Sequence, residues 1–378
     1  MKLLNCSFSR LLAIVVCIIS FLLGVYLIHI YYQKHTQIFS IIHNNGKPIA
    51  SNRIEIYAHR GGRGLVPENT LWAYKTALEQ GIDYVDMDIN MTKDGVLVVY
   101  HNTDLNLEIT RDQSGKFITK SIPIYELTYS ELQRYNVGKI NPDTKYASLF
   151  PTQHALTHAQ IPTLETVIDF VIKNAGNKVG FQIEIKADSN DIKQQPKFYK
   201  KYIATLYHLL KEKNIIDRTE IQSFNWSLLL ELQSYDSTIK TAYLTAKNSE
   251  EIIQKHFPNS HDSHSIPEII KKIYHGACWG PFEGYITKKD IEVAHQYGIK
   301  IVSWGHPPTE HSDFNTNIIL SLIQWNIDGI TTDRPDRLRS VLASLGYTAP
   351  TSIRVKQDST IMEATCLQEK EQGLRSSL

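Results

Sequence analysis

Residues suited to acid, base and ligand chemistry gather between Ile56 and His101 of this 378-residue chain. A short apolar run there ends in His59, Arg60 and two glycines, which is typical of a buried strand that opens into a polar site. The Arg60 guanidinium can hold two phosphate oxygens with one planar fork, and glycines let the backbone pass close to an anion because they carry no Cβ. His101 ends another apolar run. The two imidazoles are therefore candidates for the base and the acid of a hydrolysis.

Two carboxylates, Asp86 and Asp88, would share one face of the next strand, since successive side chains on a strand point to opposite faces. Aligned carboxylates repel each other unless a cation lies between them, and their hard oxygen atoms suit Ca²⁺ or Mg²⁺. Glu184 and Lys186 have the same spacing on a later apolar run. We predict that Asp86, Asp88 and Glu184 hold a divalent cation, Ca²⁺ or Mg²⁺. Lys186 and Arg60 would neutralise the charge of a bound phosphate.

The elements that must position these residues are short apolar runs that alternate with helical patterns, which indicates repeated strand–helix units. Eight such units over about 290 residues predict a TIM (β/α)₈ barrel, whose active site lies at the carboxyl ends of the strands. A doubly wound sheet is the alternative, but chemistry-bearing residues at the ends of several strands favour the barrel. Asn69 is expected to cap the helix that begins at Thr70. The expected strands are Ile54–His59, Tyr84–Asn90, Val179–Lys186, Thr219–Phe224, Ile239–Leu244, Gly276–Trp279, Lys300–Trp304 and Gly329–Thr332.

The barrel is expected to occupy residues 53–346. The strand–helix pattern stops at residues 104–160, which we interpret as an insertion after the second strand unit. Val96–Tyr100 follows a turn signal and is expected to pair with the strand before it. Residues 347–378 are polar and are expected to form a disordered or loosely packed tail.

The first 32 residues contain an uncharged run from Leu11 to Tyr32, long enough to cross a bilayer as a helix, which needs ~20 residues. The run is longer than the apolar core of a secretory signal peptide and offers no small-residue cleavage site, so an uncleaved anchor is favoured over a cleaved and secreted form. Lys2 and Arg10 precede the run, which favours a cytoplasmic N-terminus. We therefore expect a single-pass membrane protein, with residues 33–52 as a linker and the catalytic domain on the extracytoplasmic (periplasmic or lumenal) side.

The composition excludes some other classes of protein. The net charge of +1 gives no whole-molecule field for nucleic acid, and we expect no nucleic-acid partner. The four cysteines are too few and too scattered for a disulfide framework. The remaining composition is that of an ordinary globular enzyme.

An ordered set of motifs resembles the glycerophosphodiester phosphodiesterase family. The resemblance spans roughly residues 54 to 345, and the set is far more specific than any one motif within it. The matching residues are His59-Arg60-Gly61, Pro67-Glu68-Asn69-Thr70, Asp86-x-Asp88, Lys93-Asp94-Gly95, His101, Ile161-Pro162-Thr163-Leu164-Glu165, Glu184-Ile185-Lys186, Gln222-Ser223-Phe224 and Thr332-Asp333-Arg334-Pro335-Asp336.

The resemblance implies a TIM barrel and a metal-dependent hydrolase that splits a small glycerophosphodiester into glycerol 3-phosphate and an alcohol. It also implies that His59 accepts a proton and His101 donates one. Two alternatives share the scaffold: a lysophospholipase D acting on membrane lysophospholipids, and a catalytically inactive binding protein. Asp86 stands where the family usually has glutamate, and Asn102 where it tends to have aspartate. The shorter Asp86 would change the distance to a metal, and Asn102 cannot stabilise an imidazolium by charge.

Four more residues are candidates for the wall of the pocket. Gln222 and Phe224 would either line it or pack beside it. For Glu68 we favour a role in shaping the loop at the start of the first helix. Trp304 ends a strand and would either pack in the core or stack on a glycerol or alcohol group. Asp333 belongs to an Asp-Arg-Pro motif that is expected to form a strand-to-helix turn.

Overall fold

The computed structural model describes residues 22–26, 53–187, 189–246, 265–272, 274–305 and 314–355. The chain divides into two units, which are considered separately. The smaller unit comprises Met1–Asn52 and Ala343–Tyr347, and the larger comprises Arg53–Leu342 and Thr348–Leu378. The candidate site lies in the larger unit.

In the smaller unit the structure describes a single helical stretch, residues 22–26, within the first 52 residues. Among the described ranges there is no helix with both the length and the apolar character that a membrane span requires. Most of the predicted anchor from Leu11 to Tyr32 and all of the linker at 33–52 lie outside those ranges, as does the tail from residue 356 on. These assignments stay predictions.

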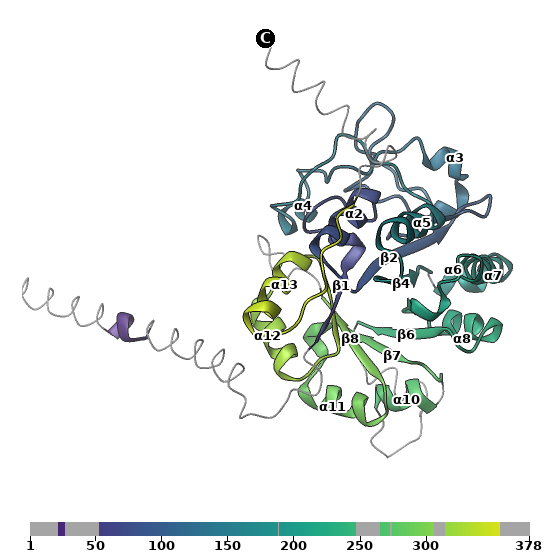
Figure 1. Cartoon of the computed structure of the whole chain (residues 1–378). Coiled ribbons are helices and arrows are strands. Elements are labelled where there is room, and N and C mark those ends of the chain that lie inside the picture. Colours follow the sequence, from purple (N-terminus) through teal and green to yellow (C-terminus); the bar gives the residue numbers. More distant parts are fainter. Residues whose placement is uncertain are drawn as a thin grey trace, which may run out of the picture. The chain divides into compact units, whose positions relative to one another are not determined.

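The larger unit contains a closed barrel of parallel strands (Figure 1). Over the described residues the sheet has nine strands; β3 pairs antiparallel with β2, and the other eight run parallel. Pairing of β1 with β2 closes the order β1-β9-β8-β7-β6-β5-β4-β2 into a ring. The predicted TIM barrel is confirmed, because a doubly wound sheet would stay open. The strands are β1 Glu55–Ala58, β2 Tyr84–Met91, β3 Leu97–Val99, β4 Gly180–Ile185, β5 Thr219–Ser223, β6 Lys240–Thr245, β7 Cys278–Pro281, β8 Lys300–Trp304 and β9 Gly329–Thr332.

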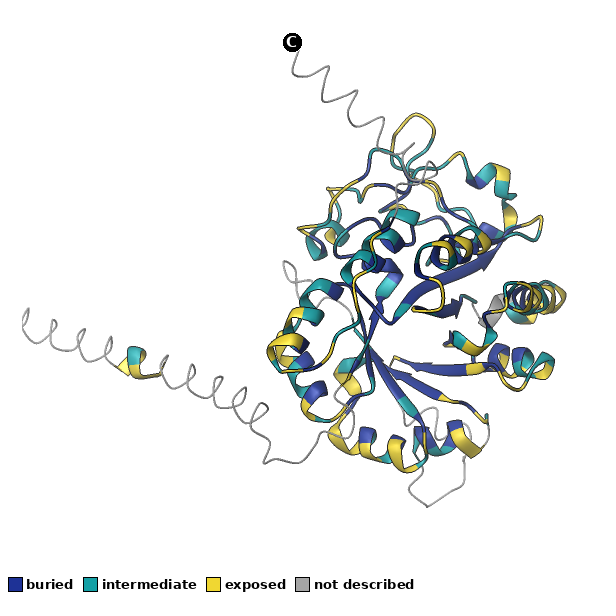
Figure 2. Ribbon diagram, viewed as in Figure 1, coloured by how far each residue is buried: buried dark blue, intermediate teal, exposed yellow. Residues whose placement is uncertain are grey.

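Helices surround the strands and turn their apolar faces inward. Figure 2 shows buried strands at the centre and exposed residues on the outer helical faces, which is the pattern expected where a parallel sheet is covered by helices. The helices of the barrel are α2 Leu71–Gln80, α5 Leu164–Ala175, α6 Ser189–Gln194, α7 Pro196–Glu212, α8 Trp226–Tyr235, α10 Ile266–Lys272, α11 Lys288–Gln296, α12 Thr316–Gln324 and α13 Pro335–Ser344. Short 3₁₀ turns lie at His59–Gly61, Ile124–Glu126, Ile216–Arg218 and Glu283–Tyr285.

The start of α2 differs from the prediction. Thr70, not Asn69, caps the helix, and its hydroxyl accepts a hydrogen bond from the Ala73 amide at 3.2 Å. Asn69 has a left-handed backbone with φ of 56°, and its side chain donates to Asp88 Oδ2 at 2.9 Å. The expectation was wrong because the amide of Asn69 is already engaged with the barrel strand.

The inserted segment between β3 and α5 is more ordered than its polar sequence indicates. It contains α3 Tyr129–Leu132 and α4 Lys145–Leu149. It also has an apolar cluster of its own, which includes Val98 of β3. The buried members of this cluster are Val98, Tyr100, Leu105, Ile109, Ile124, Leu132, Val137, Leu156, Ala159 and Ile161.

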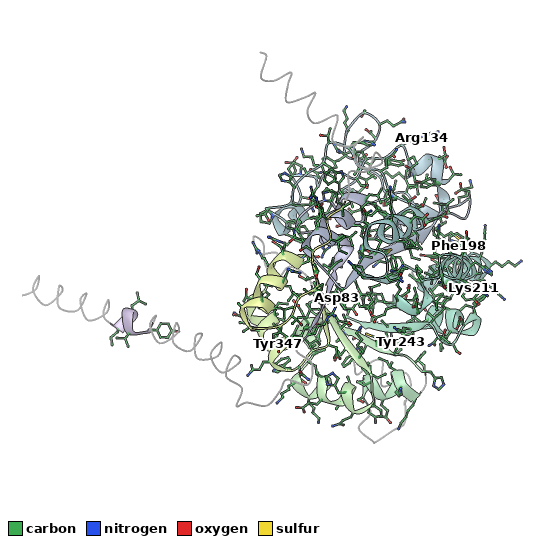
Figure 3. The ribbon with its side chains drawn as sticks, viewed as in Figure 1. Asp83, Arg134, Phe198, Lys211, Tyr243 and Tyr347 are labelled. Atoms are coloured by element: carbon green, nitrogen blue, oxygen red, sulfur yellow. The ribbon has the colours of Figure 1, made fainter. Side chains whose placement is uncertain are left out.

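A charged cluster lies inside the amino end of the barrel. Lys300 Nζ contacts the Tyr57 hydroxyl at 2.6 Å and carboxylate oxygens of Glu220 and Glu55 at 2.7 Å and 2.5 Å. We call these four residues the amino-end cluster. Nearby, the buried Asp83, labelled in Figure 3, accepts a hydrogen bond from the Ile56 amide at 2.9 Å. Polar contacts at the amino ends of the strands thus join strands that are far apart in the sequence.

Candidate active site

A cavity of about 290 Å³ opens at the carboxyl ends of the strands. Eight of the predicted site residues line it, and three more, Asp86, Asp88 and Glu68, are buried beside it through contacts described below. Three lining residues were not predicted: Leu244, Val302 and Thr331. The predicted residues in the wall are His59, Arg60, His101, Glu184, Lys186, Gln222, Phe224 and Trp304.

The turn after β1 places His59 and Arg60 at the cavity. Arg60 has a left-handed backbone with φ of 51°, and its amide donates to Asp86 Oδ2 at 3.0 Å. Gly61 follows with φ of 78°, and a Cβ there would lie 2.6 Å from the Cβ of Ala73 in α2. The glycine is therefore required for close packing on α2, and its expected role beside an anion stays a prediction.

His59 is held from behind by a carboxylate. Its Nδ1 lies 2.6 Å from Asp333 Oδ1, and the same oxygen accepts a hydrogen bond from Arg63 Nε at 2.7 Å. A carboxylate beside Arg63 only accepts, so Nδ1 carries the proton and Nε2 of the neutral ring keeps its lone pair. Burial lowers the pKa of His59 to about 4, with Arg63 adding to this effect and Asp333 opposing it. The ring is thus neutral at pH 7, as a general base must be.

His101 has a weaker partner. Its Nδ1 lies 2.9 Å from Oδ1 of Asn102, so that Nδ1 is again the protonated nitrogen. Burial, followed by the charges of Arg60 and Lys186, holds the pKa of His101 well below its usual value. Asn102 supplies orientation without the negative charge that an aspartate would add.

The three predicted metal ligands belong to two neighbouring strands. Asp88 on β2 is in register with Glu184 on β4, and Asp86 lies two residues earlier on β2. Burial raises the pKa of Asp86 well above its usual value and that of Glu184 to about 7, and in both cases the charge of Asp88 adds to the rise. Burial would also raise the pKa of Asp88, but nearby cations, chiefly Lys186, hold it well below its usual value.

Lys186 stands between two of these carboxylates. Its Nζ lies 2.9 Å from Asp88 Oδ1 and 2.6 Å from Glu184 Oε1. Among the described residues, no group of three or more His, Cys, Asp or Glu side chains is already arranged to hold a metal ion. The donor chemistry nevertheless fits a hard cation: the three carboxylates lie on two adjoining strands, and a bound cation would oppose the rise in the pKa of Asp86 that burial and the charge of Asp88 cause.

Arg60 combines an ion pair with an unused donor. Its Nη1 donates to Glu68 Oε1 at 2.9 Å, so Glu68 contacts the site through Arg60. Its Nε is buried without a hydrogen-bond partner within the described chain, and Asp88 Oδ2 lies 3.5 Å away. A buried N–H without an acceptor is costly, and a phosphate oxygen at the cavity would satisfy it.

The opposite wall of the cavity is apolar. Phe224, which is 47% exposed, meets the ring of Trp304 edge to face at 5.5 Å between centroids. Phe282 also packs edge to face on Trp304, with 5.2 Å between the ring centroids. Gln222, which also lines the cavity, donates to Asp86 Oδ1 at 2.8 Å and so positions a carboxylate. The cavity therefore has a charged side and an aromatic side.

Sequence reasoning missed three residues that contact the histidine, its carboxylate partner or the predicted metal ligands. Asp333 was interpreted as part of a turn, although its place at the end of the last strand matches the positions of the predicted site residues. Asn69 was interpreted as a cap, and its side chain instead bridges Asp88 and the hydroxyl of Tyr74. Arg63 gave no signal, because it lies on an irregular loop.

The family comparison agrees with this geometry. The model of the glycerophosphoryl diester phosphodiesterase family matches residues 59–337. The chain belongs to this family. It is an enzyme of the corresponding class, a phosphoric diester hydrolase.

Relatives and solved structures extend over most of the chain. A glycerophosphodiester phosphodiesterase of Bacillus altitudinis is 30% identical over 283 residues, which cover 75% of this chain and 96% of the relative. One from Bacillus subtilis is 26% identical over 300 residues, covering 79% and 89%. The crystal structure of a glycerophosphoryl diester phosphodiesterase from Silicibacter pomeroyi matches with a TM-score of 0.70 and 27% sequence identity. The match covers 78% of this chain and 95% of that one. The barrel that carries the family motifs in this chain thus resembles the fold of that solved structure.

Proposed function

We propose that this protein hydrolyses glycerophosphodiesters to glycerol 3-phosphate and an alcohol, with His59 as base, His101 as acid and a divalent cation at the carboxylates. The observation that carries the proposal is the cavity wall: both imidazoles line it together with Arg60 and Lys186. Each ring has Nδ1 occupied by an oxygen acceptor, which leaves Nε2 for the substrate.

The histidine roles follow from their partners. His59 is neutral, and the negative charge of Asp333 would stabilise the imidazolium that forms when Nε2 takes a proton from the attacking hydroxyl. His101 must arrive protonated to serve as acid. A bound phosphodiester anion would offset the charges of Arg60 and Lys186 that hold the pKa of His101 down. The proton then passes to the oxygen of the departing alcohol.

Arg60 and Lys186 would hold the phosphoryl oxygens. Arg60 Nε supports this role, because it makes no hydrogen bond within the described residues, and both side chains lie in the wall of the cavity. Asp86, Asp88 and Glu184 would hold Ca²⁺ or Mg²⁺, which when bound would neutralise charge on the phosphoryl group. Lys186 would then exchange its contacts with Asp88 and Glu184 for contacts with the substrate.

The aromatic side favours a second candidate substrate. Phe224, Trp304, Leu244 and Val302 offer an apolar surface that would suit the chain of a lysophospholipid as well as a small alcohol. The same phosphodiester chemistry would then be a lysophospholipase D reaction.

The test is an assay of glycerol 3-phosphate and alcohol release from glycerophosphocholine and from lysophosphatidylcholine, with Ca²⁺, Mg²⁺ or chelator. We expect cation-dependent turnover, faster on glycerophosphocholine. Lack of turnover on both substrates, with folded protein and either cation present, would leave an inactive binding protein and reject the proposal. Phosphorus NMR during turnover identifies the nucleophile, since attack by the glycerol hydroxyl passes through a cyclic phosphate and attack by water does not.

We also propose that residues 1–32 anchor the protein in a membrane, with the barrel on the extracytoplasmic side. The support is the uncharged run from Leu11 to Tyr32 and the preceding Lys2 and Arg10. A protein tagged at the C-terminus should stay in the membrane fraction after carbonate washing and be digested by protease added outside. Recovery in the soluble fraction would favour cleavage and secretion.

A further inference from the structure

The inserted segment reaches the back of the active site through one hydroxyl. Tyr146, on α4, accepts a hydrogen bond from Arg63 Nη1 at 3.2 Å and donates one to Oε2 of Glu68. Burial raises the pKa of this phenol, so the hydroxyl stays protonated and remains a donor. Both neighbours are nearly inaccessible to solvent: Arg63 is 3% exposed and Glu68 6%.

Each neighbour of Tyr146 leads to a different part of the site. Arg63 donates to Asp333 at 2.7 Å, and Asp333 holds Nδ1 of His59 at 2.6 Å. Glu68 holds Nη1 of Arg60 at 2.9 Å. The hydroxyl of Tyr146 therefore joins two chains of contacts. One leads through Arg63 to His59, and the other leads through Glu68 to Arg60.

The inserted segment also fixes Arg63 in place. The guanidinium lies 4.9 Å from the centroid of Phe150, and Phe150 packs edge to face on Tyr146 at 5.1 Å. The carbonyl oxygen of Arg63 accepts from Gln153 Nε2 at 2.7 Å. The guanidinium is thus held by side chains of the insertion on one side and by Asp333 on the other, which leaves it little freedom to choose another partner.

We propose that Tyr146 is a positioning residue that sets both the orientation of His59, through Arg63 and Asp333, and the placement of Arg60, through Glu68. The inference rests on the proposed function, in which His59 is the base and Arg60 binds phosphate. It assigns the insertion a part in catalysis: the segment completes the support of the site from behind, and Tyr146 itself touches neither substrate nor the reacting atoms.

The test compares Tyr146→Phe with Tyr135→Phe in the full-length protein. The first removes only the hydroxyl and keeps the ring that packs on Phe150. Tyr135 is a half-buried tyrosine that packs on the apolar cluster of the same insertion. We expect Tyr146→Phe to lower kcat roughly tenfold and to raise KM several-fold, within the range for residues that orient a catalytic group. Tyr135→Phe should change both by less than about twofold.

Two double variants separate the chain of contacts through Arg63 and Asp333 from the one through Glu68. In an Asp333→Asn background the effect of Tyr146→Phe on kcat should nearly vanish, because both changes act through His59. In a Glu68→Gln background its effect on KM should nearly vanish instead. Effects that simply multiply in both backgrounds would overturn the proposal, since they would mean that Tyr146 acts independently of these residues.

A spectroscopic measurement without substrate separates this inference from the proposed function. The Nδ1 proton of His59, bound to Asp333, should give a far-downfield signal that weakens or moves in Tyr146→Phe but not in Tyr135→Phe. An unchanged signal would overturn the line through Arg63 even if the enzyme is active. An inactive wild type with the expected signal change would reject the proposed function and leave the contact network standing.

Discussion

The barrel has a charged cluster at each end, and the two differ in what lies beside them. In the amino-end cluster, Lys300 contacts the carboxylates of Glu55 and Glu220 and the hydroxyl of Tyr57, so its polar tips are matched to one another. At the carboxyl end, Arg60 Nε has no hydrogen-bond acceptor among the described residues, the pKa of Asp86 is raised, and a cavity lies beside both residues. A cluster of charged residues alone therefore does not mark a functional site. Polar groups that lack a hydrogen-bond partner and lie beside a cavity do.

Removing the base should have the largest effect on the carboxyl end. In His59→Ala we expect kcat to fall roughly 10²- to 10⁴-fold, because the attacking hydroxyl loses its proton acceptor. His208→Ala, on the outer face of α7, is the matched control and should leave turnover unchanged. Steady-state assays on both proteins measure this. Retention of a tenth or more of the activity by His59→Ala would show that another group is the base.

Removing charge or cation from the carboxylates should come next. We expect chelator to abolish turnover and Asp88→Asn to lower kcat/KM by at least about 100-fold, since Asp88 is proposed as a direct ligand and also pairs with Lys186. Calorimetric titration with Ca²⁺ and Mg²⁺ should show binding to the wild type and much weaker binding to the variant. Full activity after exhaustive chelation would contradict a cation-dependent mechanism.

The carboxylate behind the base should matter less than the base itself. In Asp333→Asn we expect kcat to fall by roughly 10- to 100-fold, because the ring loses its charged partner. Asp333 opposes the lowering of the pKa of His59 to about 4, so its loss should lower that pKa further. His59 works as a base when neutral, and the acid limb of kcat/KM should therefore move to lower pH. A limb that moves to higher pH would contradict this assignment.

The aromatic side should affect recognition more than chemistry. In Trp304→Ala we expect KM to rise roughly two- to tenfold with a small change in kcat, as for the loss of one stacking contact. Tyr285→Ala, an exposed ring that meets Phe282 but does not line the cavity, serves as control. KM measured on glycerophosphodiesters with different alcohols would show which group lies against Trp304. A fall in kcat alone would place Trp304 with the catalytic groups.

The amino-end cluster should leave catalysis untouched. In Lys300→Met we expect a loss of about 2–3 kcal/mol of stability, because two carboxylates and a phenol lose a charged partner. The kcat of the folded fraction should equal that of the wild type. Urea unfolding and steady-state assays on one preparation measure both quantities. A fall in kcat beyond tenfold would mean that the two ends of the barrel are coupled.

Local sequence patterns predicted the barrel because its strands carry their signal within a few residues. Apolar runs that end in polar residues located all eight parallel strands, with the largest displacement at β7, where Gly276–Trp279 was expected and Cys278–Pro281 is observed. The alternation of side chains along β2 placed Asp86 and Asp88 on one face. Short-range periodicity was sufficient wherever an element and its chemistry lie on one strand.

Partnerships between distant segments could not be predicted in this way. Asn69 resembled a helix cap until its contact with Asp88 was known. Asp333 resembled a turn residue because its partner His59 is 274 positions away. The contact of Tyr146 with Glu68 depends on how the insertion packs, and no local pattern records that.

The bond between His59 and Asp333 has a consequence for biosynthesis. One partner leaves the ribosome among the first residues of the barrel and the other among the last, so the ring is unaligned until β9 joins β1. Contacts of such long sequence separation form late in folding, after the entropy of closing the intervening loop has been overcome. A nascent or truncated chain that lacks β9 would contain both His59 and His101 but could not hydrolyse glycerophosphodiesters. Catalytic activity would appear only when the barrel closes.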